Sequence, residues 1–472
     1  MSIPTTAAAI ARAVARGEVS ATEAVEAALA RAEEIAPLNA FTVIDRDGAL
    51  DAARRIDAGE GGGERPLLGV PFAAKDFTPT KGHPTTRGSW STGDAATDFD
   101  PAYVRRLKAA GAVLIGKTTT PEFAYSGFTH SPRWGVTRNP YDADRTPGGS
   151  SGGAAVAVAT GCVPIAEGTD MGGSVRIPAA LCGLVGLKPS LGRIPMDILP
   201  LGSDVISHFG PLATSVEEAA LFLSVTQGPD DADILSQPDP GPVYPVAPAE
   251  RPRLALSVDL GYYHVDPGVR ERIEAAAEAL RDAGATVDVV NPGWSRALND
   301  DWLALWGVVL AAAWGDALDG YRDRMDPEVV ALMEAGRKVS GVEVRRLEAT
   351  RHRLWADLAK LFGRYDALLT PTCPVTAQRV DADDSDYDAP DAEGRYRGID
   401  MTSPFNLVGE CPALSVPVGL ADGLPVGMQV VGPRFSDAEV LRIGRLIEQS
   451  VPATPPPDWR ARMQSATVTR SF

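Results

Sequence analysis

Short apolar runs alternate with longer amphipathic stretches along most of this chain, which predicts strands alternating with helices. The runs interpreted as buried strands hold four or five residues each and are too short for helices: 71–74, 112–115, 163–167, 254–258, 286–290, 366–369, 414–418 and 427–431. Helical spacing of apolar positions is found at 20–34, 104–110, 154–160, 268–283 and 436–449, with further long helices up to Phe362. This alternation favours an α/β fold, with a largely parallel sheet covered by helices on both faces.

Local signals support both the helices and the connections. Ser20 and Glu23 have the spacing of a capping box, in which a hydroxyl and a carboxylate satisfy the first free amides of a helix. The segment 228–253 instead carries seven prolines. Because each proline fixes φ and removes an N–H donor, this segment excludes a helix or a central strand. We expect it to cross the surface between two parts of the chain.

The chain is acidic, with 472 residues and a formal net charge of −17. Proteins that bind nucleic acid or anionic membranes hold them mainly through clustered Lys and Arg, and a surface of this charge repels both. The hydrophobic share of 44% and the charged share of 23% are typical of a globular protein. Composition therefore predicts a large core and no nucleic-acid partner.

No targeting or membrane segment is expected. Arg12, Arg16 and Glu18 interrupt the apolar start of the chain, which argues against a secretory signal. The most continuous apolar stretch, 302–315, is shorter than the ~20 residues that span a bilayer, and it is interpreted as a buried helix. Four widely spaced cysteines without a CxxC pattern predict neither a disulfide framework nor a zinc site. We therefore expect a cytoplasmic protein with no membrane partner and no metal.

One acidic segment invites a calcium interpretation. Residues 381–391 hold six aspartates, but the calcium-loop pattern fails because Ser385 occupies its fifth position and Asp386, not glycine, its sixth. A mobile acidic loop is the simpler interpretation. Whether this loop gates a site stays open at this stage.

Two short motifs match known expressions but lack the right context. Residues 111–118 fit the phosphate-loop pattern GxxxxGK[ST], yet the residues between its glycines are themselves a predicted strand, where a phosphate loop needs a flexible turn. Residues 149–153 fit the nucleophile-elbow pattern GxSxG, with Ser151 as the nucleophile, but a loop precedes them instead of a strand. No downstream histidine is an evident base for Ser151, so both motifs are set aside.

A longer pattern is harder to explain as flexible turns. The run GGSSGG at 148–153 is followed by a helix of small residues, a strand, and the run GTDMGGSVRIPA at 168–179. Two glycine-flanked serine loops joined by one helix and one strand can converge in space. A single Gly-Ser cluster is most often only a turn. Two of them around one apolar unit, with Asp170 and Arg176 nearby, indicate a functional site.

These runs resemble the amidase signature family. Ser174 of the second run follows Ser150 of the first at the family's spacing, and Lys75 lies in the upstream run GVPFAAKDF. The likeness continues in four further runs, at 121–124, 188–190, 366–372 and 404–432. The resemblance therefore covers nearly the whole chain.

The resemblance implies one amidase domain over residues 1–472, with a three-layer α/β/α fold and a large mixed central sheet covered by helices on both faces. We expect an N-terminal helical segment at about 1–65 and the catalytic core at about 66–225. The proline-rich crossing at 228–253 then leads to a C-terminal half at 254–472 that completes the sheet.

The family's catalytic unit is a serine, a serine that follows a cis peptide bond, and a lysine. By resemblance Ser174 is the nucleophile, Ser150 the bridging serine and Lys75 the base. The chemistry is physically reasonable, because a serine hydroxyl needs a neighbouring base and a lysine desolvated by apolar neighbours is held neutral. We expect a proton path from Ser174 through Ser150 to Lys75, returning to the leaving amine.

Glycines beside the nucleophile leave backbone amides unobstructed, and these amides would form the oxyanion hole. The residues expected to contribute are Met171, Gly172 and Gly173. Ser151 is expected to orient its loop and donate a supporting hydrogen bond, while Asp170 and Arg176 hold the turn. No metal or organic cofactor is implied.

Aromatic residues give the hints about substrate. Three of them lie between the run at 121–124 and the first serine loop, placed to meet a substrate: Tyr125, Phe128 and Trp134. Three more share a helix face, where they would line a pocket or, as we favour, fill the core: Trp302, Trp306 and Trp314. We expect a hydrophobic or aryl amide as substrate. An aryl carbamate (urethane) is an alternative, because its tetrahedral intermediate needs the same oxyanion hole.

The resemblance leaves a second function open. The family also includes an amidotransferase subunit that acts on misacylated tRNA within a complex. Residues 342–358 do not match that subunit's usual helical segment, and the charge of −17 suits tRNA poorly. An amidase with a small-molecule amide or carbamate substrate is therefore favoured. A homodimer is compatible with this function.

Overall fold

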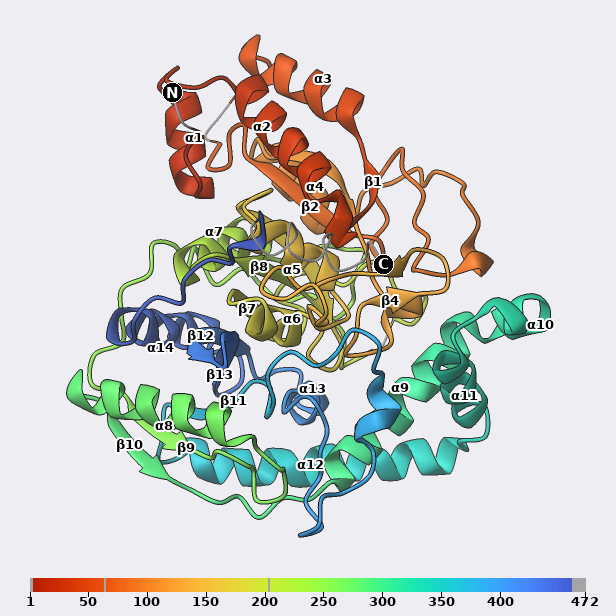
Figure 1. The fold of residues 1–472 in the computed structure, drawn as a ribbon, viewed down its shortest axis with the longest axis vertical. Helices are drawn as coiled ribbons and strands as arrows, with labels where there is room; N and C mark the ends of the chain where they lie inside the picture. The colour runs from red at the N-terminus through yellow and green to blue at the C-terminus, as the bar shows by residue number, and fades with distance from the viewer. Residues whose placement is uncertain (1–2, 63–64, 203, 461–472) are drawn as a thin grey trace, which may run out of the picture.

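The structure, a computed structural model, describes residues 3–62, 65–202 and 204–460. Its strands are β1 (Phe41–Ile44), β2 (Pro71–Lys75), β3 (Val113–Thr118), β4 (His130–Ser131), β5 (Gly135–Val136), β6 (Ile165–Asp170), β7 (Val185–Lys188), β8 (His208–Ala213), β9 (Arg253–Leu256), β10 (Thr286–Val289), β11 (Ala367–Pro371), β12 (Ala413–Ala421) and β13 (Leu424–Val431). Within the described residues, eleven strands form one sheet in the order β1–β3–β2–β6–β8–β7–β12–β13–β11–β9–β10, and β4 pairs with β5 separately. Figure 1 shows this sheet crossing the molecule from the N-terminal helices to the C-terminal half.

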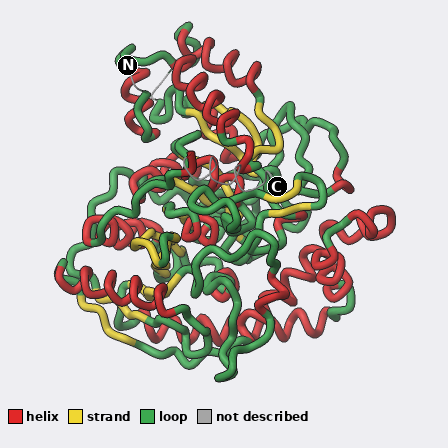
Figure 2. The backbone as a smooth tube through the Cα atoms, viewed as in Figure 1, coloured by secondary structure: helices red, strands yellow, loops and turns green. Residues whose placement is uncertain are grey.

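Helices cover the sheet on both faces, as the predicted three-layer fold requires (Figures 1 and 2). They are α1 (Ala7–Ala15), α2 (Ala21–Glu34), α3 (Arg46–Asp57), α4 (Ala102–Ala109), α5 (Gly152–Ala159), α6 (Arg176–Leu181), α7 (Val216–Thr226), α8 (Pro267–Asp282), α9 (Ala297–Trp314), α10 (Leu318–Tyr321), α11 (Pro327–Gly336), α12 (Gly341–Phe362), α13 (Pro404–Leu407) and α14 (Asp437–Ser450). Successive side chains of β2 pack into different apolar clusters, one on each face of the sheet. Ala73 joins the apolar cluster that contains α2 and α5, whereas Phe72 and Ala74 join the cluster that contains α4, α7, α8 and α14.

The sheet is mixed, which confirms the mixed central sheet that the resemblance implied and corrects the largely parallel sheet expected from alternation alone. Parallel pairing is found in β3–β2, β2–β6, β11–β9 and β9–β10. The other neighbours are antiparallel: β1–β3, β6–β8, β8–β7, β7–β12, β12–β13 and β13–β11. A short connection without a crossover helix brings a strand back antiparallel. The turn at Asp422 and Gly423, both with positive φ, does this between β12 and β13.

Several local predictions are confirmed. Both hydrogen bonds of the capping box join Ser20 and Glu23, and α2 ends at Glu34. No helix or strand lies between the end of α7 at Thr226 and the start of β9 at Arg253, as the prolines require. The strands β1, β7 and β8 were not predicted, because their sequences show neither a clear alternation nor a long apolar run.

The helix α9 differs from its prediction as a buried helix. Only a minority of its side chains are buried, among them Leu298, Trp306 and Leu310. With the short helical turns that follow, the helical run from Ala297 to Arg324 is long and apolar enough to cross a membrane, by length and composition only. One such helix is weak evidence for a membrane. In Figure 1, α9 leads outward to α10 and α11 at the side of the molecule.

Candidate active site

Lys75 lies at the carboxyl end of β2, beside the parallel strand β6, and its side chain is fully buried. Its Nζ donates hydrogen bonds to Ser150 Oγ at 2.6 Å and to Thr169 Oγ1 at 2.9 Å. Ser150 follows a cis peptide bond from Gly149, as expected. The structure therefore brings together two of the three predicted catalytic residues and adds Thr169, which the sequence analysis missed.

Burial controls the protonation of this lysine. Desolvation lowers the pKa of Lys75 to about 7, although the nearby charges of Glu167 and Asp170 oppose that shift. Glu167 is itself buried, and its carboxylate accepts hydrogen bonds from the Lys75 amide at 2.9 Å and the Tyr103 hydroxyl at 2.9 Å. Burial raises the pKa of Glu167. A lysine with its pKa near neutrality is suited to accept a proton at physiological pH.

Ser174 lies next to this pair, in the turn between β6 and α6. It is half-buried and lines a partly open cavity of about 100 Å³. The amide of Ser151 donates to the Ser174 carbonyl at 3.1 Å, which joins the two serine loops. Within the described residues, no hydrogen bond engages the Ser174 hydroxyl. Such a contact often tightens only when substrate binds.

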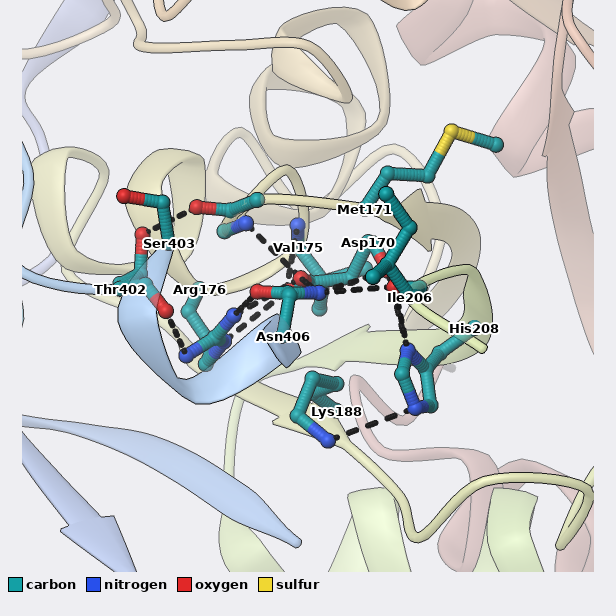
Figure 3. A network of polar contacts seen from close by, with 12 residues as sticks. Asp170, Met171, Val175, Arg176, Lys188, Ile206, His208, Thr402, Ser403 and Asn406 are labelled. Carbon is teal, nitrogen blue, oxygen red and sulfur yellow. Dashed lines mark hydrogen bonds and ion pairs between the residues drawn. The ribbon is translucent and has the colours of Figure 1, made fainter. Parts of the chain in front are cut away.

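A buried ion pair holds this turn in place (Figure 3). The Arg176 guanidinium donates to both carboxylate oxygens of Asp170, at 2.9 Å and 2.8 Å. Asp170 also accepts from the amide of Gly173 at 2.8 Å and that of Val175 at 3.3 Å. Burial acts against the ionised carboxylate, but the charge and hydrogen bonds of Arg176 hold the pKa of Asp170 well below its usual range. Asp170 and Arg176 therefore hold the turn, as expected.

The same contacts show which backbone amides of the predicted oxyanion hole already donate a hydrogen bond within the protein and which do not. Gly173, with a φ of 128° that favours glycine, gives its amide to Asp170 and is not free to bind a substrate oxygen. This differs from the prediction for Gly173, because the sequence does not show that Asp170 folds back onto the turn. No hydrogen bond among the described residues uses the amides of Met171, Gly172 or Ser174.

Residues far away in the sequence support the turn from its other side. Thr402 Oγ1 donates to the Gly172 carbonyl at 2.6 Å, and Asn406 Nδ2 donates to Asp170 Oδ1 at 3.0 Å. Trp302 Nε1 donates to the Met171 carbonyl at 2.7 Å. The run at 404–432 contributed to the family resemblance, but nothing in the sequence predicted these hydrogen bonds to the turn.

The cavity beside Ser174 combines an apolar wall with charged groups. Its apolar and aromatic side chains include Tyr125, Ile177, Trp302, Leu303, Trp306 and Ile399. Its charged side chains are Arg296, Asp300, Asp384, Asp388 and Asp400. Tyr125 therefore lies on the wall of this cavity, and its contact with a substrate stays a prediction. This wall is the part of the site that could hold a hydrophobic group.

Four other predicted aromatic positions need correction or refinement. Trp302 and Trp306 line the cavity. The core position that we favoured is therefore wrong for Trp302. For Trp306 it is incomplete, because this buried side chain also borders the cavity. Trp314 is half-buried and stacks on Phe123, with 5.4 Å between the ring centroids. Phe128 and Trp134 do not line this cavity.

The acidic segment 381–391 lies along the cavity wall. Asp384 accepts a hydrogen bond from the Gly127 amide at 3.1 Å, and the Ser385 amide donates to Glu328 at 3.2 Å. Burial raises the pKa of Asp384 to about 6. The segment is thus held on both sides in this structure. No group of three His, Cys, Asp or Glu that could hold a metal ion was found in the described part of the chain.

The two discarded motifs lack the required structure. Residues 113–118 of the phosphate-loop match are β3, and Lys117 is buried against Asp76 at 3.4 Å. Ser151 is fully buried at the start of α5, and its hydroxyl donates to the Thr169 carbonyl at 3.4 Å, the supporting role expected for it. His208 is buried, and burial lowers its pKa to about 3.

Comparisons with known proteins agree with this geometry. A family model described as Amidase matches residues 23–441. An acylamidase of Rhodococcus erythropolis is 36% identical over 446 residues, covering 92% of each chain. The glutamyl-tRNA(Gln) amidotransferase subunit of Symbiobacterium thermophilum is 37% identical over 462 residues, covering 90% of this chain and 93% of that protein.

Solved structures are similar over nearly the whole chain. A bacterial aryl acylamidase of the amidase signature enzymes superposes with a TM-score of 0.87 at 30% identity, covering 94% of this chain and 96% of that chain. A 6-aminohexanoate cyclic dimer hydrolase superposes with a TM-score of 0.85 at 29% identity, covering 96% and 98% of the two chains.

Proposed function

This chain belongs to the amidase signature family, as a hydrolase of carbon–nitrogen bonds, and we propose that it cleaves a hydrophobic or aryl amide through an acyl-enzyme on Ser174. The observation that carries this proposal is the buried hydrogen bond between Lys75 Nζ and Ser150 Oγ at 2.6 Å. It provides a base beside the serine loops that needs no histidine.

The proposed reaction starts with proton transfer. Neutral Lys75 takes a proton from the Ser150 hydroxyl, which takes one from Ser174 as the Ser174 oxygen bonds to the amide carbon. The charge that forms on the amide oxygen is stabilised by backbone amides of the turn, since those of Gly172 and Ser174 have no partner among the described residues. The proton then returns through Ser150 to the leaving amine, and water hydrolyses the acyl-enzyme.

The cavity wall supports the substrate class. Trp302, Leu303 and Trp306 present apolar surface beside Ser174, where an aryl or alkyl group would lose contact with water. The similarity to an acylamidase and an aryl acylamidase supports an aryl amide in particular. An aryl carbamate fits the same cavity and the same oxyanion position.

The main alternative is the amidotransferase function, because a relative of that name is similar to this chain at nearly the same identity. That function requires tRNA and partner chains. The net charge of −17 favours a hydrolase acting alone on a small molecule. Release of 4-nitroaniline from butyryl-4-nitroanilide by the isolated protein, abolished in Ser174→Ala, supports the proposal. Amidation of misacylated tRNA with partner chains, and no anilide hydrolysis, would favour the alternative.

The charge of the cavity leads to a prediction about substrate charge. Butyryl- and succinyl-4-nitroanilide differ by a terminal carboxylate, which would lie near Asp300, Asp384 and Asp388. We expect kcat/KM to be about tenfold lower for the succinyl compound, equivalent to ~1.4 kcal/mol of repulsion, and the difference to shrink in high salt. Faster cleavage of the succinyl compound would show that Arg296 dominates the cavity instead.

A further inference from the structure

The peptide groups of the turn before Ser174 are not all held in the same way. The group joining Gly172 to Gly173 is fixed at both ends, because Thr402 donates to its oxygen and its N–H donates to Asp170. The group joining Met171 to Gly172 is held at its oxygen by Trp302 Nε1, at 2.7 Å. Its N–H has no partner among the described residues.

Because the peptide bond is trans, this one contact also fixes the direction in which the Gly172 N–H points. The described cis bonds are at Gly149–Ser150 and Tyr244–Pro245, so the bond between Met171 and Gly172 is trans. In a trans peptide the C=O and N–H point in opposite directions. Fixing the Met171 oxygen therefore fixes the direction of the Gly172 N–H, which lies beside Ser174 on the cavity wall.

The indole ring also limits movement of this peptide. A Cβ added at Gly172 would overlap the Trp302 ring, so the ring packs directly on the Gly172 backbone. Trp302 comes from α9, which is anchored near the turn because Asn299 Nδ2 donates to Ser403 Oγ at 3.0 Å. The half-exposed helix α9 thus reaches the catalytic turn through one side chain.

We propose that Trp302 is a positioning residue for catalysis: its indole N–H, by holding the Met171 carbonyl, aims the Gly172 amide at the oxyanion. This inference rests on the proposed function of Ser174 as nucleophile. It also gives α9 a role in turnover, since the same indole forms part of the substrate wall.

The test separates the N–H of Trp302 from its ring. Trp302→Phe keeps an aromatic wall and loses the donor. We expect kcat for butyryl-4-nitroanilide to fall about 10- to 100-fold, with KM changed less than about threefold, because the contact matters most once charge forms on the oxygen. Trp355→Phe, on α12 and outside the cavity, is the matched control and should leave both constants unchanged.

A transition-state mimic adds a readout that general destabilisation would not give. In a trifluoromethyl ketone analogue of the substrate, the Ser174 oxygen bonds to the carbonyl carbon as its proton passes through Ser150 to Lys75. The carbonyl π electrons move onto the ketone oxygen, which becomes negatively charged. The Ki of this analogue should rise in Trp302→Phe by about the same factor as kcat/KM falls. Binding of the amine product, which lacks that oxygen, should be unchanged.

If Trp302→Phe does not fold, Trp302 can be replaced with β-(3-benzothienyl)alanine, which keeps the two-ring shape and lacks the N–H. Near wild-type kcat in either folded variant, or a rise in KM alone, would overturn the inference and leave the proposed function intact. A wild-type protein that neither cleaves anilides nor binds the ketone would overturn the proposed function, and this inference with it.

Discussion

Replacing Lys75 with methionine should lower kcat for anilide hydrolysis by about 10²- to 10⁴-fold, the usual contribution of a positioned general base. Methionine fills a similar volume and carries no charge, so the buried site loses its base without gaining an unpaired ion. The thermal unfolding midpoint should stay close to that of the wild type. Steady-state kinetics and a thermal melt on the same preparation measure both effects.

The pH profile of the wild type provides a second check on Lys75. Burial lowers the pKa of Lys75 to about 7, and the protonated amine cannot accept a proton. The value of kcat/KM should therefore be low in acid, rise with pH through about 7 and level off above it, with this step absent from the residual activity of Lys75→Met. The exposed Lys81→Met serves as control and should behave as the wild type. Near wild-type turnover in Lys75→Met would refute the lysine-base mechanism.

Arg176→Met should destabilise the fold by about 3–5 kcal/mol, because it leaves the buried Asp170 carboxylate without its counterion. A domain has only about 5–15 kcal/mol of stability in total, so the urea midpoint should fall sharply. The Arg176 guanidinium also donates to Gln429 Oε1 at 2.6 Å and to Asn406 Oδ1 at 2.5 Å. The loss thus extends from the turn to β13 and α13.

Two further variants test the cause of that loss. Arg145→Met breaks a pair with Asp142 whose side chains are 37% and 40% exposed, and it should cost less than about 1 kcal/mol. The double variant Asp170→Asn with Arg176→Met should be more stable than Arg176→Met alone, because the unpaired charge is gone. A double variant as unstable as the single one would mean that packing of Arg176, and not the ion pair, stabilises the turn.

The sequence predicted the parts of the site that lie within continuous motifs. Lys75, Ser150 and Ser174 each lie in a run that resembles the family, and the apolar residues before Lys75 indicated its burial. Thr169 lies in the second of these serine runs, but only the pairing of β2 with β6 shows that it faces Lys75. The α/β fold was likewise predictable from the order of strands and helices.

The rest of the site depends on tertiary contacts that no local pattern encodes. Helical spacing showed that Trp302 and Trp306 share one side of α9, but not that this side faces Ser174. Thr402 and Asn406 reach the turn from more than two hundred residues away. Alternation of strands and helices by itself gave the wrong strand directions for the same reason, since it does not show whether a connection crosses over or turns back. The mixed sheet was implied only by the resemblance.

Covalent labelling shows directly which serine is the nucleophile. The protein is treated with a fluorophosphonate, digested, and its peptides mapped by mass spectrometry, with Ser174→Ala as the control. We expect one adduct, on Ser174, and none in the Ser174→Ala variant. An adduct on Ser151 would contradict the proposed mechanism, because Ser151, which is fully buried in this structure, would then be the nucleophile in place of Ser174.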